Sequence, residues 1–165
     1  MKFVEIVEAD LDRPEHQQAV LELTDAYARD PMGNGRPLEE EVRRNLISGL
    51  RQHPTTVIFL AHRGSAAIGI ANCFIGFSTF AARPLINISD LAVLPGFRGH
   101  HVGRRLLGAV ENKARELGCC KLTIEVQENN SRARHVYESF GFAQAVYVEE
   151  AGGALFLSKP LNNPS

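Results

Sequence analysis

The chain has 165 residues, enough for a single domain (residues 1–165) that buries roughly two-thirds of its unfolded surface. A net charge of -1 argues against a nucleic-acid or anionic-membrane partner, and no apolar run reaches the roughly 18 residues of a membrane span. Three cysteines and an N-terminus without an apolar stretch favour a cytoplasmic protein without a disulfide framework.

The first third of the chain predicts one strand followed by two helices. Residues 3–7 alternate between apolar and polar side chains, which is typical of a strand. Apolar residues at helical spacing then predict helices over 14–30 and 38–51. The proline and glycines of 31–35 break the pattern and separate the two helices.

The apolar period then changes from that of a helix to that of strands. Continuous apolar runs predict buried strands over 56–61, 66–77 and 85–93. Gly64 and Ser65 mark the turn between the first two. The third strand also contains polar side chains, Asp90 among them, so part of this strand is predicted to have a role other than packing in the core.

The last third of the chain predicts two helices and three strands. Apolar stripes predict helices over 102–117 and 133–140, with an alternating strand over 122–126 between them. Residues 146–148 and 155–157 are predicted to pair as a hairpin around two glycines. The order β-α-α-β-β-β-α-β-α-β-β predicts an α/β (α+β) domain with a mixed, mostly antiparallel central sheet flanked by helices.

The loop between the predicted strand 85–93 and the following helix is basic. Arg98, Arg104 and Arg105 lie there with His100 and His101 between them. The first turn of a helix has unpaired N–H groups and a positive dipole end, so it binds anions. The loop is therefore predicted to bind a diphosphate, although neither the P-loop nor the dinucleotide-binding fingerprint is present. The alternative is a connection that is basic but binds nothing.

Two motifs resemble those of the GNAT acyltransferases. Residues 98–103, with the sequence RGHHVG, are similar to [Q/R]-x-x-G-x-[G/A], with His101 where the family has glycine. Residues 126–142 are similar to V-x-x-x-N-x-x-A-x-x-x-Y-x-x-x-G-F, with Asn130 and Tyr137 at its polar positions. His101 would then adopt a positive φ, which histidine does more readily than most residues. The two motifs occur in the family's order and spacing.

The resemblance implies an acetyl-CoA-dependent N-acetyltransferase. Backbone groups of Leu91 and Val93 would pair with the pantetheine arm, and the Val93 N–H would polarise the thioester carbonyl. Asn130 would bind the pantetheine or shape the entry of the last helix, and Tyr137 would protonate the departing thiolate. The diphosphate would lie on the backbone amides of Arg98, Gly99, His100, His101, Val102, Gly103 and Arg104.

The base that deprotonates the amine is not fixed by the motifs. Asp90 is the best-placed carboxylate, and the equal alternative is a structural carboxylate in an ion pair. Glu125 and a water relay are further candidates. No metal is expected, because adjacent histidines in one loop rarely bind the same ion.

The acceptor also stays open. The resemblance favours a primary amine on a small molecule over one on a protein or peptide, and it allows a homodimer. A CoA-binding sensor without turnover and a nucleotide-binding protein are the rival interpretations.

Overall fold

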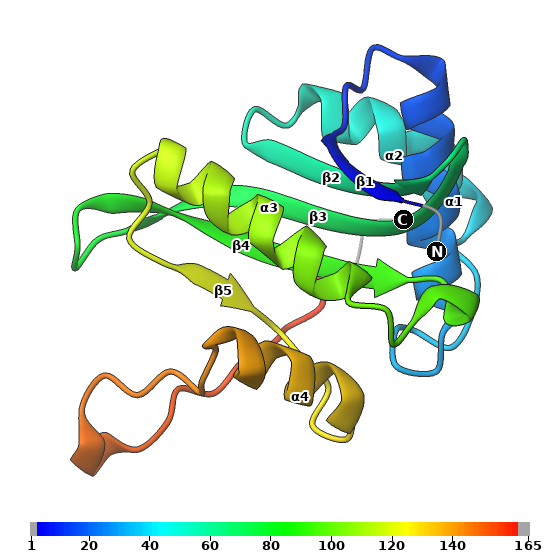
Figure 1. The fold of residues 1–165 in the computed structure, drawn as a ribbon. Helices are drawn as coiled ribbons and strands as arrows, with labels where there is room; N and C mark the ends of the chain where they lie inside the picture. Colours follow the sequence, from blue (N-terminus) through cyan, green and yellow to red (C-terminus); the bar gives the residue numbers. More distant parts are fainter. Residues whose placement is uncertain (1–2, 162–165) are drawn as a thin grey trace.

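In the computed structural model, which describes residues 3–161, five strands lie side by side in chain order within one sheet (Figure 1). The strands are β1 (Val4–Glu8), β2 (Thr56–Arg63), β3 (Ala66–Ser78), β4 (Arg83–Val93) and β5 (Leu122–Ile124). Strands β1 to β4 pair antiparallel, and β5 runs parallel to β4. The mixed, mostly antiparallel sheet predicted from the sequence is confirmed.

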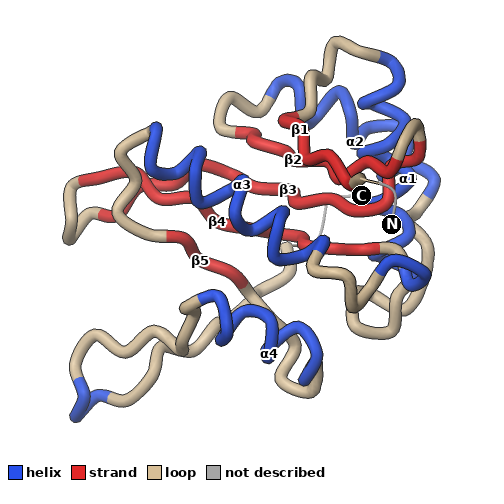
Figure 2. Tube along the Cα trace, viewed as in Figure 1, coloured by secondary structure: helices blue, strands red, loops and turns tan. Residues whose placement is uncertain are grey.

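Helices cover both faces of this sheet (Figures 1 and 2). They are α1 (Pro14–Arg29), α2 (Glu40–Gln52), α3 (Val102–Glu116) and α4 (Ser131–Phe140). One core cluster joins α1 and α2 to the sheet through residues such as Leu23 and Leu60. The other joins α3 and α4 to the opposite face through residues such as Leu106 and Ile88. No helix in the described part of the chain is long and apolar enough to cross a membrane.

A shift of register in the β3–β4 pair determines which side chains face each other. Asn72 lies opposite Asp90, and the next pair along the ladder is Cys73 with Ile88, so Ser89 is the extra residue of a β-bulge. Because side chains alternate between the two faces of a sheet, the bulge changes the face assignment of everything beyond it. It places Asp90 on the face covered by α1.

The predicted C-terminal hairpin is wrong for the described residues. Residues 146–148 and 155–157 form no strand there, and one backbone bond, from Ala154 N–H to Ala145 O at 2.7 Å, links the two arms. A 3-10 turn, η2 (Glu149–Ala151), occupies the tip, and the arms are drawn as loops in Figure 2. Alternation predicts that a segment suits a sheet, but a strand also needs a neighbouring edge to bind its N–H and C=O groups.

Candidate active site

Strand β4 extends beyond the strand beside it. β5 pairs with β4 over three residues only and ends at Ile124, opposite Ile88. β4 continues to Val93, and within residues 3–161 this last part of the strand pairs with β3 alone. In Figure 1 the end of β4 separates from β5, which turns toward α4. Residues 89–93 therefore have one open edge.

Leu91 and Val93 direct backbone groups into this open edge. Leu94 donates its N–H to Ile68 O, across the β3–β4 pair, at 2.9 Å. Opposed residues of an antiparallel pair alternate between hydrogen-bonded and non-hydrogen-bonded pairs, so Leu91 and Val93 belong to the second kind. Their N–H and C=O groups face away from β3. This is the geometry that the resemblance requires of the two residues.

The loop after β4 presents a row of N–H groups. Gly99 has φ 81° and His101, the N-cap of α3, has φ 62° and ψ 15°. The positive φ expected at His101 is therefore confirmed. The first backbone bond of α3 runs from Arg105 N–H to His101 O at 3.0 Å, so among the described residues the N–H groups of 99–104 have no acceptor. Successive free N–H groups of this kind form an anion-binding concavity.

Arg98 is bonded to the protein itself. Its Nε donates to Val93 O at 2.8 Å, and its Nη2 forms an ion pair with Asp30 Oδ2 at 2.7 Å. The hydrogen bond from Arg98, assisted by the backbone N–H of Met32, holds the pKa of Asp30 below its usual value. Arg98 thus joins the end of β4 to the end of α1. Its positive charge is matched locally by Asp30.

The remaining basic side chains of the loop lie at the surface. Arg104 donates to Ser139 Oγ on α4 at 2.6 Å, and Arg105 donates to the backbone carbonyl of Val4. His100 and His101 are exposed. Within residues 3–161, no three His, Cys, Asp or Glu side chains lie close enough together to hold a metal ion. The groups of this loop that are available to bind an anion are therefore mainly its backbone N–H groups.

Asp90 is a partly buried carboxylate with a neutral partner. Its Oδ2 accepts a hydrogen bond from Asn72 Nδ2 at 3.0 Å, and the same nitrogen donates to Thr24 Oγ1 on α1 at 3.0 Å. Burial raises the pKa of Asp90, and the hydrogen bond from Asn72 opposes part of that rise. No cation forms an ion pair with Asp90 in the described part of the chain. The structure therefore does not support the alternative of an ion-paired structural carboxylate.

Tyr137 faces the same region from α4. It is 8% exposed, and its ring packs edge-on against Phe142 with the ring centroids 6.1 Å apart. Burial raises the pKa of Tyr137 well above its usual range, with a smaller contribution from Tyr27 on α1. The pKa of Tyr27 is raised first by burial and then by the charge of Asp90. Side chains from α1, β4 and α4 thus influence one another at the open edge.

Asn130 fulfils the second of its two expected roles. It is the N-cap of α4, and its Oδ1 accepts a hydrogen bond from Ala133 N–H at 3.2 Å. A side-chain oxygen in this position binds one of the otherwise unpaired N–H groups of the first turn. Asn130 thereby sets the start of the helix that carries Tyr137.

Three residues of this region were not predicted from the sequence: Asn72, Thr24 and Tyr27. Asn72 carried a usable signal, because it is the single amide inside the apolar stretch of residues 68–74. A buried polar side chain must find a partner, so it points to another polar group nearby. The other two lie on α1, where polar residues are ordinary and carry no such signal.

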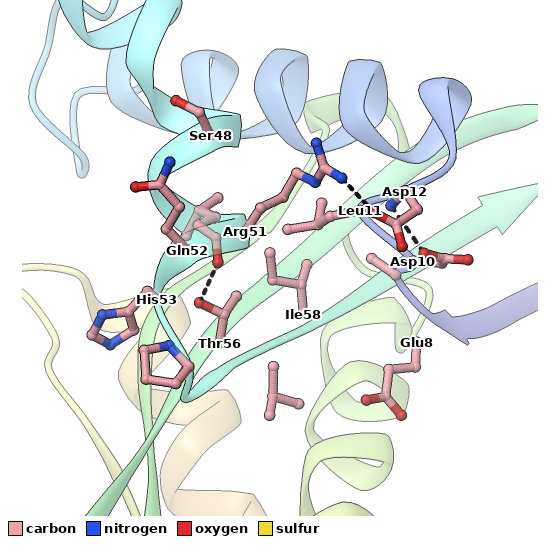
Figure 3. Close-up of a pocket in the computed structure, with 14 residues that line it drawn as sticks. Glu8, Asp10, Leu11, Asp12, Ser48, Arg51, Gln52, His53, Thr56 and Ile58 are labelled. Atoms are coloured by element: carbon pink, nitrogen blue, oxygen red, sulfur yellow. Dashed lines mark hydrogen bonds and ion pairs between the residues drawn. The ribbon is translucent and has the colours of Figure 1, made fainter.

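The cavity of about 610 Å³ shown in Figure 3 lies elsewhere, between the end of β1, the end of α2 and the start of β2. Several of its polar groups already bind other parts of the protein. Arg51 Nη2 contacts Asp12 Oδ1 at 2.6 Å, and Thr56 Oγ1 donates to Leu50 O at 2.9 Å. None of the predicted site residues lines it. The open edge of β4, with its unpaired backbone groups, is the better candidate for the active site.

Sequence comparisons find relatives over most of this fold. The model of the acetyltransferase (GNAT) family matches residues 19–142. An uncharacterized N-acetyltransferase of Bacillus subtilis (strain 168), YhfO, is 31% identical over 120 residues, covering 73% of this chain and 74% of the relative. Streptothricin acetyltransferase of Streptomyces lavendulae is 34% identical over 109 residues, covering 59% of this chain and 58% of the relative.

Solved structures share the same arrangement. Aminoglycoside N-acetyltransferase AAC(6')-Iy in complex with CoA superposes with a TM-score of 0.73 at 18% identity, covering 98% of this chain and 97% of the other. Aminoglycoside acetyltransferase meta-AAC0020 in complex with sisomicin gives a TM-score of 0.76 at 16% identity, covering 97% of each chain. These likenesses show the fold. Because the family model spans α1 to the end of α4 and thus the whole candidate site, the chain belongs to the acetyltransferase (GNAT) family and is an N-acetyltransferase.

Proposed function

We propose that the chain transfers the acetyl group of acetyl-CoA to a primary amine of a small molecule, by direct attack of the amine in a ternary complex. One observation carries the proposal. At the open edge of β4, the free backbone groups of Leu91 and the free N–H of Val93 lie next to Asp90, a partly buried carboxylate without a cationic partner among residues 3–161. Backbone that can hold a thioester therefore adjoins a group that can accept a proton.

The residues present fit the groups of acetyl-CoA. The free N–H groups of 99–104 suit a diphosphate, which binds well at a helix N-terminus. The free backbone of Leu91 and Val93 suits the amides of the pantetheine arm, as an added strand would. Arg98 donates a hydrogen bond to the Val93 carbonyl, so the N–H is the backbone group of Val93 that remains free to bind a ligand. When bound, acetyl-CoA supplies an acetyl group activated as a thioester.

Asp90 and Tyr137 carry out opposite proton transfers. The amine attacks in its neutral form, after its ammonium has lost a proton to solvent, and its nitrogen must lose one further proton as the amide forms; a carboxylate with a raised pKa is a better base for that second proton. The Val93 N–H donates to the thioester oxygen, where negative charge develops. As the N–C bond forms and the C–S bond breaks, Asp90 takes this further proton from the nitrogen, and Tyr137 gives its hydroxyl proton to the sulfur and regains one from solvent. The raised pKa of Tyr137 keeps its hydroxyl protonated until then.

Two observations support a small-molecule amine as the acceptor. Most of the relatives and neighbours whose names give an acceptor are named for small molecules, namely streptothricin, thialysine or aminoglycosides, whereas one relative and one neighbour are named as ribosomal-protein-alanine N-acetyltransferases. The carboxylates of Asp90, Asp30 and Glu125 all act on Tyr27 electrostatically, so the surroundings of that phenol are acidic. An acidic site attracts a cationic amine and favours its delivery to the base.

Asp90→Asn tests this assignment. With acetyl-CoA and a panel of small amines, we expect kcat/KM to fall by about 10²–10⁴-fold, the usual contribution of an acid–base group. Binding of acetyl-CoA, measured by calorimetry, stays unchanged. Asp12→Asn, which alters an exposed carboxylate of the Figure 3 cavity, is the matched control and keeps full activity. Undiminished turnover by Asp90→Asn contradicts the assignment, and a wild-type chain that releases no CoA with any amine indicates the CoA-binding sensor.

Asp90→Asn should lower activity but raise the stability of the fold above the acid range of pH. Because the folded-state pKa of Asp90 is raised, the wild-type chain is most stable below the unfolded pKa and loses stability as pH rises through the folded pKa. Asparagine does not titrate. Asp90→Asn should therefore have the higher melting temperature at pH 8, and the difference should disappear near pH 4.

A further inference from the structure

Asn72 lies where a side chain can control Asp90. The β-bulge at Ser89 brings the two residues directly opposite each other on β3 and β4. Asn72 is 3% exposed and belongs to an otherwise apolar stretch of β3. A residue that only filled space at this position would be apolar, because a buried amide must be hydrogen-bonded to be tolerated.

Both N–H groups of the amide are used. Nδ2 of Asn72 donates to Asp90 Oδ2 and to Thr24 Oγ1, each at 3.0 Å. The Thr24 bond ties the amide to α1, and the Asp90 bond uses the remaining proton. The carboxylate is therefore held by a donor that is itself fixed from a second element of the fold.

The oxygen of the same amide has no partner among residues 3–161. Asn72 Oδ1 is buried and accepts no hydrogen bond from this part of the chain, which costs free energy. Turning the amide over would let this oxygen accept from the Thr24 hydroxyl. It would also place the oxygen against Asp90 Oδ2, so that two acceptors met. The observed orientation thus favours the ionised carboxylate over the satisfaction of Asn72 itself.

We propose that Asn72 is a positioning residue that, anchored by Thr24, holds the ionised carboxylate of Asp90 in place for deprotonation of the amine. The inference rests on the proposed function, because it requires Asp90 to be the base. A merely structural amide would join β3 to α1 through Thr24 and leave the titration of Asp90 unaffected. The pH profile of the reaction separates the two roles.

The ionisation of the amine itself is common to the wild-type chain and its variants, and other titratable groups near Asp90 do not obscure the differences between their profiles. Tyr27 approaches from α1 and Tyr137 from α4, and the pKa values of both are raised, so neither titrates in the acid range. Burial raises the pKa of Cys73 on β3 to about 12. Asp30 and Glu125 are the other carboxylates that act on Tyr27; Arg98 holds the pKa of Asp30 low, and Glu125→Gln removes the negative charge at residue 125.

The test compares the acid limb of kcat/KM in four chains: wild type, Asn72→Leu, Asn72→Asp and Thr24→Val. Asn72→Leu removes the donor at similar volume, and we expect the limb to move to higher pH by about one unit. Asn72→Asp keeps the shape and places two carboxylates together, so the shift should be larger. Thr24→Val leaves the Asn72–Asp90 bond intact and should shift the limb least. The melting temperature and the calorimetric binding of acetyl-CoA identify any variant that fails to fold. If Asn72→Leu fails to fold, Asn72→Asp provides the test.

The two failures are distinguishable. If Asp90→Asn is inactive while both Asn72 variants keep the wild-type acid limb, the positioning role is overturned and the proposed function stands. If Asp90→Asn is active, Asp90 is not the base and the proposed mechanism fails with the inference. An upward shift in both Asn72 variants, larger for aspartate, supports the positioning role.

Discussion

The two parts of the candidate site use different chemical groups: one uses backbone N–H groups and the other uses side chains. The loop 98–104 offers backbone N–H groups, while its polar side chains are exposed or, like Arg98, bonded to the protein itself. The cluster of Asp90, Asn72 and Tyr137 instead offers side chains, of which Asn72 and Tyr137 are buried and Asp90 is partly buried. Every residue has a backbone N–H, so the loop depends on its dihedral angles. The cluster depends on particular atoms in a particular register.

This difference predicts how each part responds to substitution. The loop should tolerate substitutions that preserve its backbone conformation. Substitutions that do have an effect should act through backbone strain or through affinity for the ligand. The cluster should lose function when single atoms are removed, even though its packing survives.

Tyr137→Phe removes one oxygen from the cluster. We expect kcat to fall by about 10²–10⁴-fold with the KM for acetyl-CoA little changed, because a group that acts on the leaving sulfur contributes to the chemical step. The ring still packs on Phe142, so the melting temperature should barely move. Tyr147→Phe, at a tyrosine that is 70% exposed, is the matched control. Unchanged kcat where chemistry limits the rate would remove Tyr137 from the mechanism.

Arg98→Ala tests whether the loop and the cluster are joined through β4. Loss of its bonds to Val93 and Asp30 should weaken acetyl-CoA binding by tenfold or more, since hydrogen bonds to charged groups contribute about 1.5–3 kcal/mol. A pantetheine analogue without phosphates should lose a similar factor, because Arg98 acts on the strand end. Arg104→Ala, which loses a surface contact with Ser139, should have a smaller effect. Calorimetry that found the Arg98 loss only for phosphate-bearing ligands would show that its charge binds phosphate directly.

Much of the fold was predictable because it depends on local periodicity. The first nine elements, from residues 3–7 to 133–140, occur as their apolar patterns predict. The hairpin of 146–148 and 155–157 did not follow, because strand pairing depends on an available edge and β5 supplies only three residues. The loop motif at 98–103 was also local, so the positive φ of His101 could be anticipated.

The cluster was predictable only in part. Tyr137 was identified through a motif and Asp90 through its place near the end of a predicted strand, but the pairing of Asp90 with Asn72 depends on the bulge at Ser89, which no local pattern shows. The ion pair of Arg98 with Asp30 joins residues far apart in the chain. Contacts of this kind follow from the register of the sheet and the packing of α1, which the sequence does not determine locally.

His101→Gly tests the backbone nature of the loop and carries the smallest expected effect. A left-handed conformation costs a non-glycine residue about 1 kcal/mol, so the glycine variant should be more stable by about that amount in urea unfolding. Affinity for acetyl-CoA should be equal or improved. Gly99→Ala is the converse control: Gly99 has φ 81°, there is open space around the new methyl group, and the variant should be less stable than the wild-type chain. A tenfold loss of affinity in His101→Gly would show that the imidazole itself binds the ligand.

Residue-resolved amide hydrogen exchange, with and without acetyl-CoA, tests the central claim most directly. The open edge of β4 and the loop after it should hold the ligand through backbone groups, so exchange should slow at Leu91, Val93 and residues 99–104. A pantetheine analogue without phosphates should protect the first two and spare the loop. Protection centred instead on the Figure 3 cavity, around residues 10–12 and 53–56, with the loop unchanged, would contradict this account.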